Sequence, residues 1–131
     1  MSTLALRLAT PADRPFIHST WLKGQRFNNP FFAETEPTAY YAAYGAIVDR
    51  ILDNPTTTVA VACLSDEPDV IVGYSVTTAP GILHWVYVKK QWRKNGVAKM
   101  LVADTIKTVT AITYAGLQIA KKRKYTFNPF I

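Results

Sequence analysis

The sequence has little cysteine and no long apolar run, and both absences limit what the protein can be. Its one cysteine, Cys63, lies in an apolar segment, which is typical of a small core residue, and a lone cysteine cannot form a disulfide within the chain. No apolar stretch approaches the length that spans a bilayer, and the first residues carry no signal-peptide pattern. We therefore expect a cytoplasmic protein that has no membrane partner.

The sequence also lacks internal repeats and linker-like segments. Hydrophobic residues make up 49% of the chain and charged residues 18%, which is a globular composition and not a disordered one. Its 131 residues are enough for one domain with a real core and too few for two. We predict a single domain over residues 1–131, present as a monomer or a homodimer.

Acidic residues are scarce, with 9 against 15 basic residues, so the net charge is +6. Much of the excess lies in two clusters, one at residues 121–124 and the other made of Lys89, Lys90, Arg93, Lys94 and Lys99. Nucleic acid would explain both clusters. Alternatively, a phosphate-rich cofactor would explain the cluster from Lys89 to Lys99, and a solvated helix end would explain the cluster at residues 121–124. We favour the second explanation, so nucleic acid is not the expected partner.

Hydrophobic periodicity and turn residues predict alternating strands and helices. In the first half we expect a strand at 4–8, a helix from 10 to about 24, a loop at 26–37 and a helix at 38–52. In the second half we expect strands at 56–64, 70–78 and 82–88, a long helix at 96–107, a strand at 109–113, a helix at 114–123 and a strand-like end at 124–130. This order predicts an α+β fold whose mixed, mostly antiparallel central sheet is flanked by helices on both faces.

The segment from Ile82 to Leu101 joins a buried strand to a helix through a basic, glycine-containing loop. A helix that starts this way leaves backbone N–H groups unpaired, and together with the helix dipole they favour an anion. The segment therefore predicts an anion site at the start of the helix.

The same loop carries the residues of a family resemblance. Arg93-Lys94-Asn95-Gly96-Val97-Ala98 resembles the signature of the GCN5-related N-acetyltransferases: Arg or Gln, two residues, Gly, one residue, then Gly or Ala. Val88 stands where the family keeps an aliphatic residue, and Val72-Gly73-Tyr74 and Leu6-Arg7-Leu8-Ala9 resemble its third and first strands. The resemblance covers nearly the whole chain and is strongest at residues 70–102. It implies the acyl-CoA N-acyltransferase fold.

The resemblance also implies a co-substrate, acetyl-CoA, an amine acceptor and no metal. The backbone at Val86, Tyr87 and Val88 would face the pantetheine arm. The pyrophosphate would lie against the loop, whose backbone N–H groups and positive charges come from Arg93, Lys94, Asn95, Gly96, Val97, Ala98 and Lys99.

Catalytic candidates are less clear. In the family a tyrosine of the last long helix is frequently the general acid, and aligning its neighbouring Gly-aromatic pair on Lys124-Tyr125 puts Ala120 at that position. Tyr114 and Tyr125 are the nearby substitutes. His84 stands where some amine acetyltransferases of the family have a proton-accepting histidine, and in a strand without a bulge it would share a face with Val86 and Val88. The alternative is a histidine that only packs in the sheet.

Glu34 and Glu36 lie on the loop that, in the family, borders the acceptor site. Either could attract a cationic amine or act as base through water, and the alternative is a solvated loop. Taken together, the residues predict an acetyl-CoA-dependent N-acetyltransferase that moves an acetyl group to a primary amine of a small molecule or protein. The alternatives are a binding protein of the same fold without turnover, because the usual tyrosine is missing, and a basic nucleic-acid-binding protein.

Overall fold

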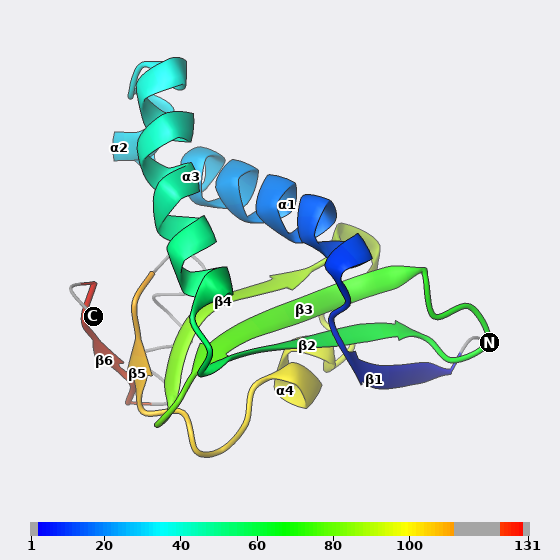
Figure 1. Ribbon diagram of the computed structural model, residues 1–131. Helices are drawn as coiled ribbons and strands as arrows, with labels where there is room; N and C mark the ends of the chain where they lie inside the picture. The colour runs from blue at the N-terminus through cyan, green and yellow to red at the C-terminus, as the bar shows by residue number, and fades with distance from the viewer. Residues whose placement is uncertain (1–2, 112–123, 130–131) are drawn as a thin grey trace.

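The computed structural model describes residues 3–111 and 124–129 of the chain, and they form one six-stranded sheet with strand order β1-β2-β3-β4-β5-β6 (Figure 1). The first four strands pair antiparallel, and their bounds are β1 (Leu4–Leu8), β2 (Thr57–Leu64), β3 (Ile71–Thr78) and β4 (Ile82–Val88). The short strands β5 (Thr108–Val109) and β6 (Thr126–Phe127) add to β4 in parallel. The predicted mixed, mostly antiparallel sheet is confirmed.

Helices cover both faces of this sheet, as predicted (Figure 1). On one face lie α1 (Arg14–Phe27), which follows the 3-10 turn η1 (Pro11–Asp13), and α3 (Pro37–Asp53). The one-turn helix α2 (Pro30–Ala33) connects them. On the other face lies α4 (Val97–Leu101), which follows β4 and the 3-10 turn η2 (Lys90–Trp92).

The face under α1 and α3 is built from large rings, and we call it the aromatic face. Its buried rings are those of Trp21, Tyr40, Tyr74 and Trp85, with the two indoles stacked at 6.2 Å between ring centroids. The hydroxyls are satisfied by helix backbone: Tyr74 Oη donates to the carbonyl of Ile17 at 3.0 Å, and Tyr40 Oη donates to the carbonyl of Leu22 at 2.6 Å. These hydrogen bonds remove the cost of burying a polar group. The first holds α1 against β3 of the sheet, and the second holds α3 against α1.

The face under α4 is built from small and branched side chains, and we call it the aliphatic face. Its buried residues are Ala62, Val72, Val97 and Leu101. Gly73 brings α4 close, because a Cβ there would stand 2.6 Å from the Tyr87 carbonyl oxygen and 3.3 Å from the Leu101 side chain. Ser75 Oγ donates to the Leu101 carbonyl at 3.0 Å and so satisfies the last turn of this helix.

An ion pair ties the start of α1 to β1. The guanidinium of Arg7 donates to both carboxylate oxygens of Asp13, at 2.7 and 3.0 Å, and the backbone N–H of Thr10 donates to Asp13 at 2.7 Å. The Arg7 hydrogen bonds lower the pKa of the Asp13 carboxyl to about 2, although burial acts in the opposite direction. The charged form of Asp13 therefore stabilises this connection.

Two predicted boundaries in the first half are wrong. The first helix does not stop near Gly24 but continues to Phe27, and Asn28 then caps it by donating from Nδ2 to the Gly24 carbonyl at 2.8 Å. Gly24 lets α1 pack closely against Trp85, since a Cβ at this position would lie 2.8 Å from the Trp85 ring. The predicted loop at 26–37 also contains helix α2, which Asn29 caps through its side chain.

Two boundaries after the signature loop are wrong as well. The helix predicted at 96–107 ends at Leu101, because Val102 is extended with φ −101° and ψ 116°. Val102 and Ile106 pack with Leu83 and Val109 at the start of β4, so their apolar spacing comes from a packed loop. The strand predicted at 109–113 is shorter and begins one residue earlier, and the helix predicted at 114–123 lies outside the described residues.

Candidate active site

A bulge in β4 determines where His84 lies. Val76 of β3 pairs with Trp85, but the next residue, Thr77, pairs with Leu83, which leaves His84 as the extra residue. A bulge of this kind changes which face the following side chains occupy. Trp85 packs on the aromatic face, whereas Val86 and Val88 pack on the aliphatic face. The prediction that His84 shares a face with Val86 and Val88 applied to a strand without a bulge, and the bulge removes that condition. His84 instead lines a hollow together with residues of α3.

His84 is buried, with 4% of its surface exposed, and both ring nitrogens have partners. Nε2 is hydrogen-bonded to the hydroxyl of Thr78, and Nδ1 to the hydroxyl of Thr110 at 2.7 Å. Burial lowers the pKa of His84 below the ordinary value of 6.5, and the nearby charge of Arg50 acts in the same direction. The imidazole is therefore neutral at neutral pH and has one nitrogen that can accept a proton.

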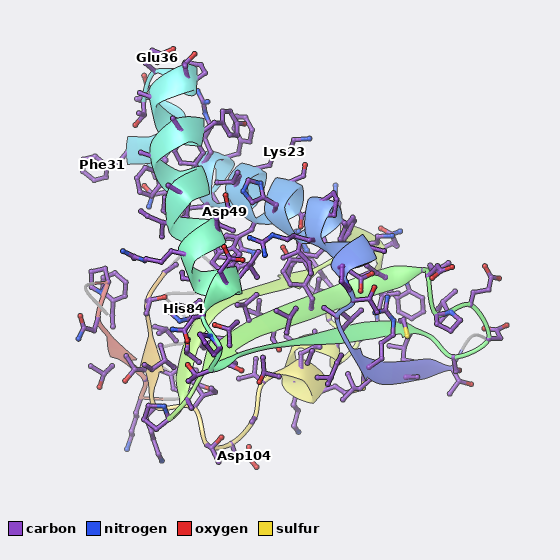
Figure 2. The ribbon with its side chains drawn as sticks, in the orientation of Figure 1. Lys23, Phe31, Glu36, Asp49, His84 and Asp104 are labelled. Atoms are coloured by element: carbon purple, nitrogen blue, oxygen red, sulfur yellow. The ribbon has the colours of Figure 1, made fainter. Side chains whose placement is uncertain are left out.

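Two hollows meet at His84. The first, which we call the strand groove, has a volume of about 330 Å³ and follows the edge of β4; it is lined by Gly24, Asn28, Leu83, His84, Trp85, Val86, Tyr87, Val88, Arg93, Ala98, Val109, Ala111 and Tyr125. The second, which we call the helix cavity, has a volume of about 230 Å³ and lies under α1 and α3; it is lined by Trp21, Gln25, Asn29, Phe32, Tyr44, Ile47, Arg50, Ile51, His84, Thr110, Ala111, Phe127 and Pro129. Among the residues that the structure describes, only His84 and Ala111 line both. Figure 2 shows His84 close to the C-terminal end of α3.

The strand groove exists because β5 pairs with only the first part of β4. The parallel pairing covers Ile82 with Thr108 and Leu83 with Val109, and within the described residues it stops there. From His84 to Val88 the strand edge is therefore left beside the groove. The groove brings together five of the residues predicted to bind the cofactor, namely Val86, Tyr87, Val88, Arg93 and Ala98.

The basic loop at the end of this groove has an unusual backbone. Lys94 and Gly96 both have positive φ, of 65° and 79°, and the Arg93 side chain donates from Nε to the Val88 carbonyl at 3.1 Å. Asn95 donates from Nδ2 to the Arg93 carbonyl at 3.1 Å. A Cβ added to Gly96 would meet nothing within 4 Å, so the space before this glycine is open. Gly96 is required for its conformation and leaves room for a ligand to approach the backbone.

Other predicted site residues lie away from the groove. The side chain of Val97 is buried in the aliphatic face, and Lys99 lines a separate hollow with Lys107 and Lys124. Glu34 is exposed at the end of α2 and lines neither hollow that meets at His84. Tyr114 lies outside the described residues.

Glu36 has a structural explanation. Its carboxylate accepts hydrogen bonds from the backbone N–H groups of Thr38 at 3.0 Å and Ala39 at 2.7 Å, which caps α3. Figure 2 shows it at the end of this helix that is remote from His84. The loop carboxylates are thus not brought to His84.

Sequence reasoning missed several residues of the site. Thr78 and Thr110 hold the imidazole, and Gln25, Tyr44 and Arg50 line the helix cavity. One signal was present for Thr78, which lies across the short turn between the predicted strands at 70–78 and 82–88. None was present for the other four, because their positions depend on how α1, α3 and β5 pack around the bulge.

Comparison with known proteins identifies the fold. No protein-family model and no curated protein sequence matches the chain. Among solved structures, YycN from Bacillus subtilis, classed as an acetyltransferase, superposes with a TM-score of 0.66 at 16% identity, over 92% of this chain and 88% of its own. A GCN5-related N-acetyltransferase from Rhodopseudomonas palustris superposes with a TM-score of 0.55 at 18% identity, over 93% and 81%. The aminoglycoside N-acetyltransferase AAC(6′)-Iy in complex with CoA superposes with a TM-score of 0.54 at 16% identity, over 95% and 89%.

The chain therefore has the fold of the GCN5-related N-acetyltransferases. Within residues 3–111 and 124–129, none of the helices is long and apolar enough to cross a membrane. The same residues contain no group of three or more His, Cys, Asp or Glu side chains placed to hold a metal ion.

Proposed function

We propose that this protein is an acetyl-CoA-dependent N-acetyltransferase that acetylates a primary amine. The observation that carries the proposal is the position of His84, a neutral buried imidazole where the strand groove and the helix cavity meet. An enzyme that joins two substrates needs two binding spaces and a proton acceptor between them. The fold supports the choice of reaction, since the structural neighbours are acetyltransferases and one of them was solved with CoA.

The strand groove fits acetyl-CoA. The edge of β4 at Val86 to Val88 offers backbone groups to the pantetheine arm, and Arg93 and Ala98 continue the groove toward the basic loop. There the open space before Gly96 and the positive charges of Lys94 and Arg93 suit the pyrophosphate. When bound, acetyl-CoA supplies the acetyl group as an activated thioester.

His84 acts as the general base through Thr110 in this proposal. The hydroxyl of Thr110 is hydrogen-bonded to His84 Nδ1 and also lines the helix cavity. A hydroxyl can accept a proton from an amine while it donates its own to the imidazole. Thr78 holds the other ring nitrogen, which fixes the orientation of the ring.

Two described tyrosines line the strand groove with His84, Tyr87 and Tyr125. The ring of Tyr87 packs against Phe16 and Tyr74, so Tyr125 is our candidate to protonate the departing thiolate. It comes directly before β6 and packs, like Val86, against the cluster that contains Leu83. Tyr114 stays a second candidate from the sequence. A Tyr125→Phe protein that keeps its affinity for acetyl-CoA and loses turnover would assign the acid to Tyr125.

Cofactor binding is tested at Gly96 with a matched pair of variants. Asn and Asp both tolerate the positive φ of this position and have nearly the same size, so they differ mainly in charge. We expect Gly96→Asp to weaken acetyl-CoA binding at least ~tenfold more than Gly96→Asn at low salt, because a carboxylate repels the phosphates. Calorimetry measures both affinities. Equal affinities would place the pyrophosphate elsewhere, and no binding by the wild-type protein would reject the proposal.

Turnover separates the enzyme from a binding protein of the same fold. Release of the CoA thiol is followed with a panel of primary amines, for wild type and for His84→Gln. We expect the variant to bind acetyl-CoA normally and to lose about a hundredfold or more in kcat. Because the pKa of His84 is lowered, the wild-type rate should hold at neutral pH and fall only below pH 6.5. Normal binding without thiol release by the wild type would instead establish a binding protein.

A further inference from the structure

The helix cavity carries information about the acceptor. Its volume of about 230 Å³ lies below the range of roughly 300–1,000 Å³ that is usual for drug-sized ligands, so its occupant is small. Four residues with large aromatic rings line it, Trp21, Phe32, Tyr44 and Phe127. Burial raises the pKa of Tyr44 to about 12, so its hydroxyl stays protonated. The cavity therefore suits a small molecule with an apolar or aromatic body.

The charge around the cavity is of one sign. Arg50 lines it, and no Asp or Glu does, although all nine acidic residues of the chain lie in the described part. The preceding residue, Asp49, is bonded instead to Arg14 at 3.0 Å. Within residues 3–111 and 124–129, Arg50 takes part in no ion pair. A site with one free guanidinium and no carboxylate attracts an anionic group and disfavours a polycation.

The cavity wall also contains a buried hydrogen-bond acceptor, the side-chain carbonyl of Gln25. Gln25 lines the cavity with 4% of its surface exposed, and its Oε1 is buried without a hydrogen-bond partner. The indole N–H of Trp21, beside the Tyr44 hydroxyl, also makes no regular hydrogen bond. An unpaired buried carbonyl is costly, and a ligand N–H would satisfy it. The wall of the cavity thus contains the unpaired carbonyl of Gln25, which can accept from an amine, and the guanidinium of Arg50, which can pair with an anion.

We propose that the acceptor is a free α-amino acid with an apolar or aromatic side chain. Its carboxylate pairs with Arg50, an amine N–H donates to Gln25 Oε1, and its side chain packs on the rings of Trp21 and Phe32. The inference rests on the proposed function. The amine nitrogen forms a bond to the acetyl carbonyl carbon as the carbon–sulfur bond breaks, and the products are an N-acetyl amino acid and CoA. The reacting form is the neutral amine, which the ammonium group gives by losing a proton to water. In the transfer the nitrogen loses one further proton, through Thr110 to His84, and the sulfur gains one.

The experiment uses two amines that differ only by a carboxylate, phenylalanine and phenethylamine, with spermidine as the polycation. Calorimetry measures the binding of each amine to the protein alone and to the protein saturated with CoA, and thiol release gives kcat/KM. We expect phenylalanine to exceed phenethylamine at least ~tenfold in affinity and in kcat/KM, since a charge-assisted pair is made only by the first. Arg50→Gln should remove this advantage and Arg50→Lys should restore part of it.

The matched control is Lys23→Gln, which removes an equal charge from the exposed surface of α1 and outside the cavity. It should keep the full preference for phenylalanine. Phenethylamine or spermidine binding as well as phenylalanine, or an Arg50→Gln protein with an unchanged preference, would overturn the inference. Failure of acetyl-CoA to bind would reject the proposed function separately, because amine binding is measured without the cofactor as well.

Discussion

The two faces of the sheet differ in what they bury. On the aromatic face, rings such as Trp21 and Trp85 pack between the sheet and its helices, and the helix cavity lies beside Trp21. On the aliphatic face, Gly73 lets α4 pack almost onto the backbone. Large, rigid side chains create room for a ligand beside the sheet, whereas small ones close the gap.

This difference assigns the two substrates of the proposed reaction to different parts of the molecule. The helix cavity lies within the aromatic face, where the rings and the Arg50 guanidinium would select an amine that also carries a carboxylate. The strand groove runs along the edge of β4 to the basic loop before α4, where backbone and positive charge suit a phosphate-bearing cofactor. The two spaces meet at His84, the extra residue of the bulge, because its side chain lines both.

The largest expected effect is a loss of stability when Trp85 is removed from the aromatic face. The Trp85→Ala protein loses the stacking on Trp21 and leaves a cavity against Gly24, so we expect a loss of about 3–5 kcal/mol in the free energy of unfolding. Urea denaturation measures it. The control is Phe31→Ala, which removes a ring that is 86% exposed and should change stability by less than about 0.5 kcal/mol. Similar losses in both proteins would contradict the role of the stacked indoles.

A second variant, Gly73→Val, disrupts the packing on the aliphatic face. Gly73→Val places a Cβ 2.6 Å from the Tyr87 carbonyl oxygen, which belongs to backbone that cannot move aside, and we expect a loss of about 2–3 kcal/mol. Gly45→Ala is the matched control on the other face. A Cβ at this position in α3 would lie 3.7 Å from the nearest atom of His18, an ordinary contact, so we expect a gain of up to about 1 kcal/mol. Thermal unfolding should show opposite signs, and equal losses would remove the contrast between the faces.

The third prediction concerns the ion pair that fixes α1, and with it the aromatic face, to β1. The pKa of Asp13 is lowered from 3.8 to about 2, so Asp13→Asn should cost about 2 kcal/mol at neutral pH. A lowered folded-state pKa contributes stability that is present above the unfolded value and lost as pH falls through the folded value. The difference between wild type and variant should therefore shrink between about pH 4 and pH 2. Urea unfolding across this range tests it, with Asp104→Asn at an exposed turn as the control; a difference independent of pH would contradict the ion pair.

Much of the fold could be predicted from the sequence, because local patterns specify it. The strand at 82–88 and the antiparallel strands before it follow from β-branched runs separated by turn residues, and both were found where expected. The helix at 96–107 was predicted too long for a physical reason. Val102 and Ile106 repeat at a helical spacing, yet they pack separately under Leu83, and a spacing pattern cannot tell a helix from a packed loop.

The site was less predictable, because it depends on one irregularity. The signature loop and the edge of β4 were located from a resemblance, and the structure places Arg93 and Ala98 beside Val86 to Val88. The face that His84 occupies could not be predicted, since nothing in the residues around it marks the bulge. Arg50 and Gln25 come from two helices that meet only in the folded chain, and neither belongs to a motif.

The final prediction tests whether the proposed proton path runs toward the aromatic face. Thr78 and Thr110 both hydrogen-bond to His84, but only Thr110 also lines the helix cavity. Replacing either by Val removes one hydroxyl with little change in shape, so each variant frees one ring nitrogen of His84. We expect Thr110→Val to lower kcat at least ~tenfold more than Thr78→Val, because only the first breaks the path from the amine to the imidazole. Thiol-release assays at saturating acetyl-CoA measure both. An equal loss would mean that the two threonines only orient the ring, and a larger loss in Thr78→Val would place the path on the side of β3.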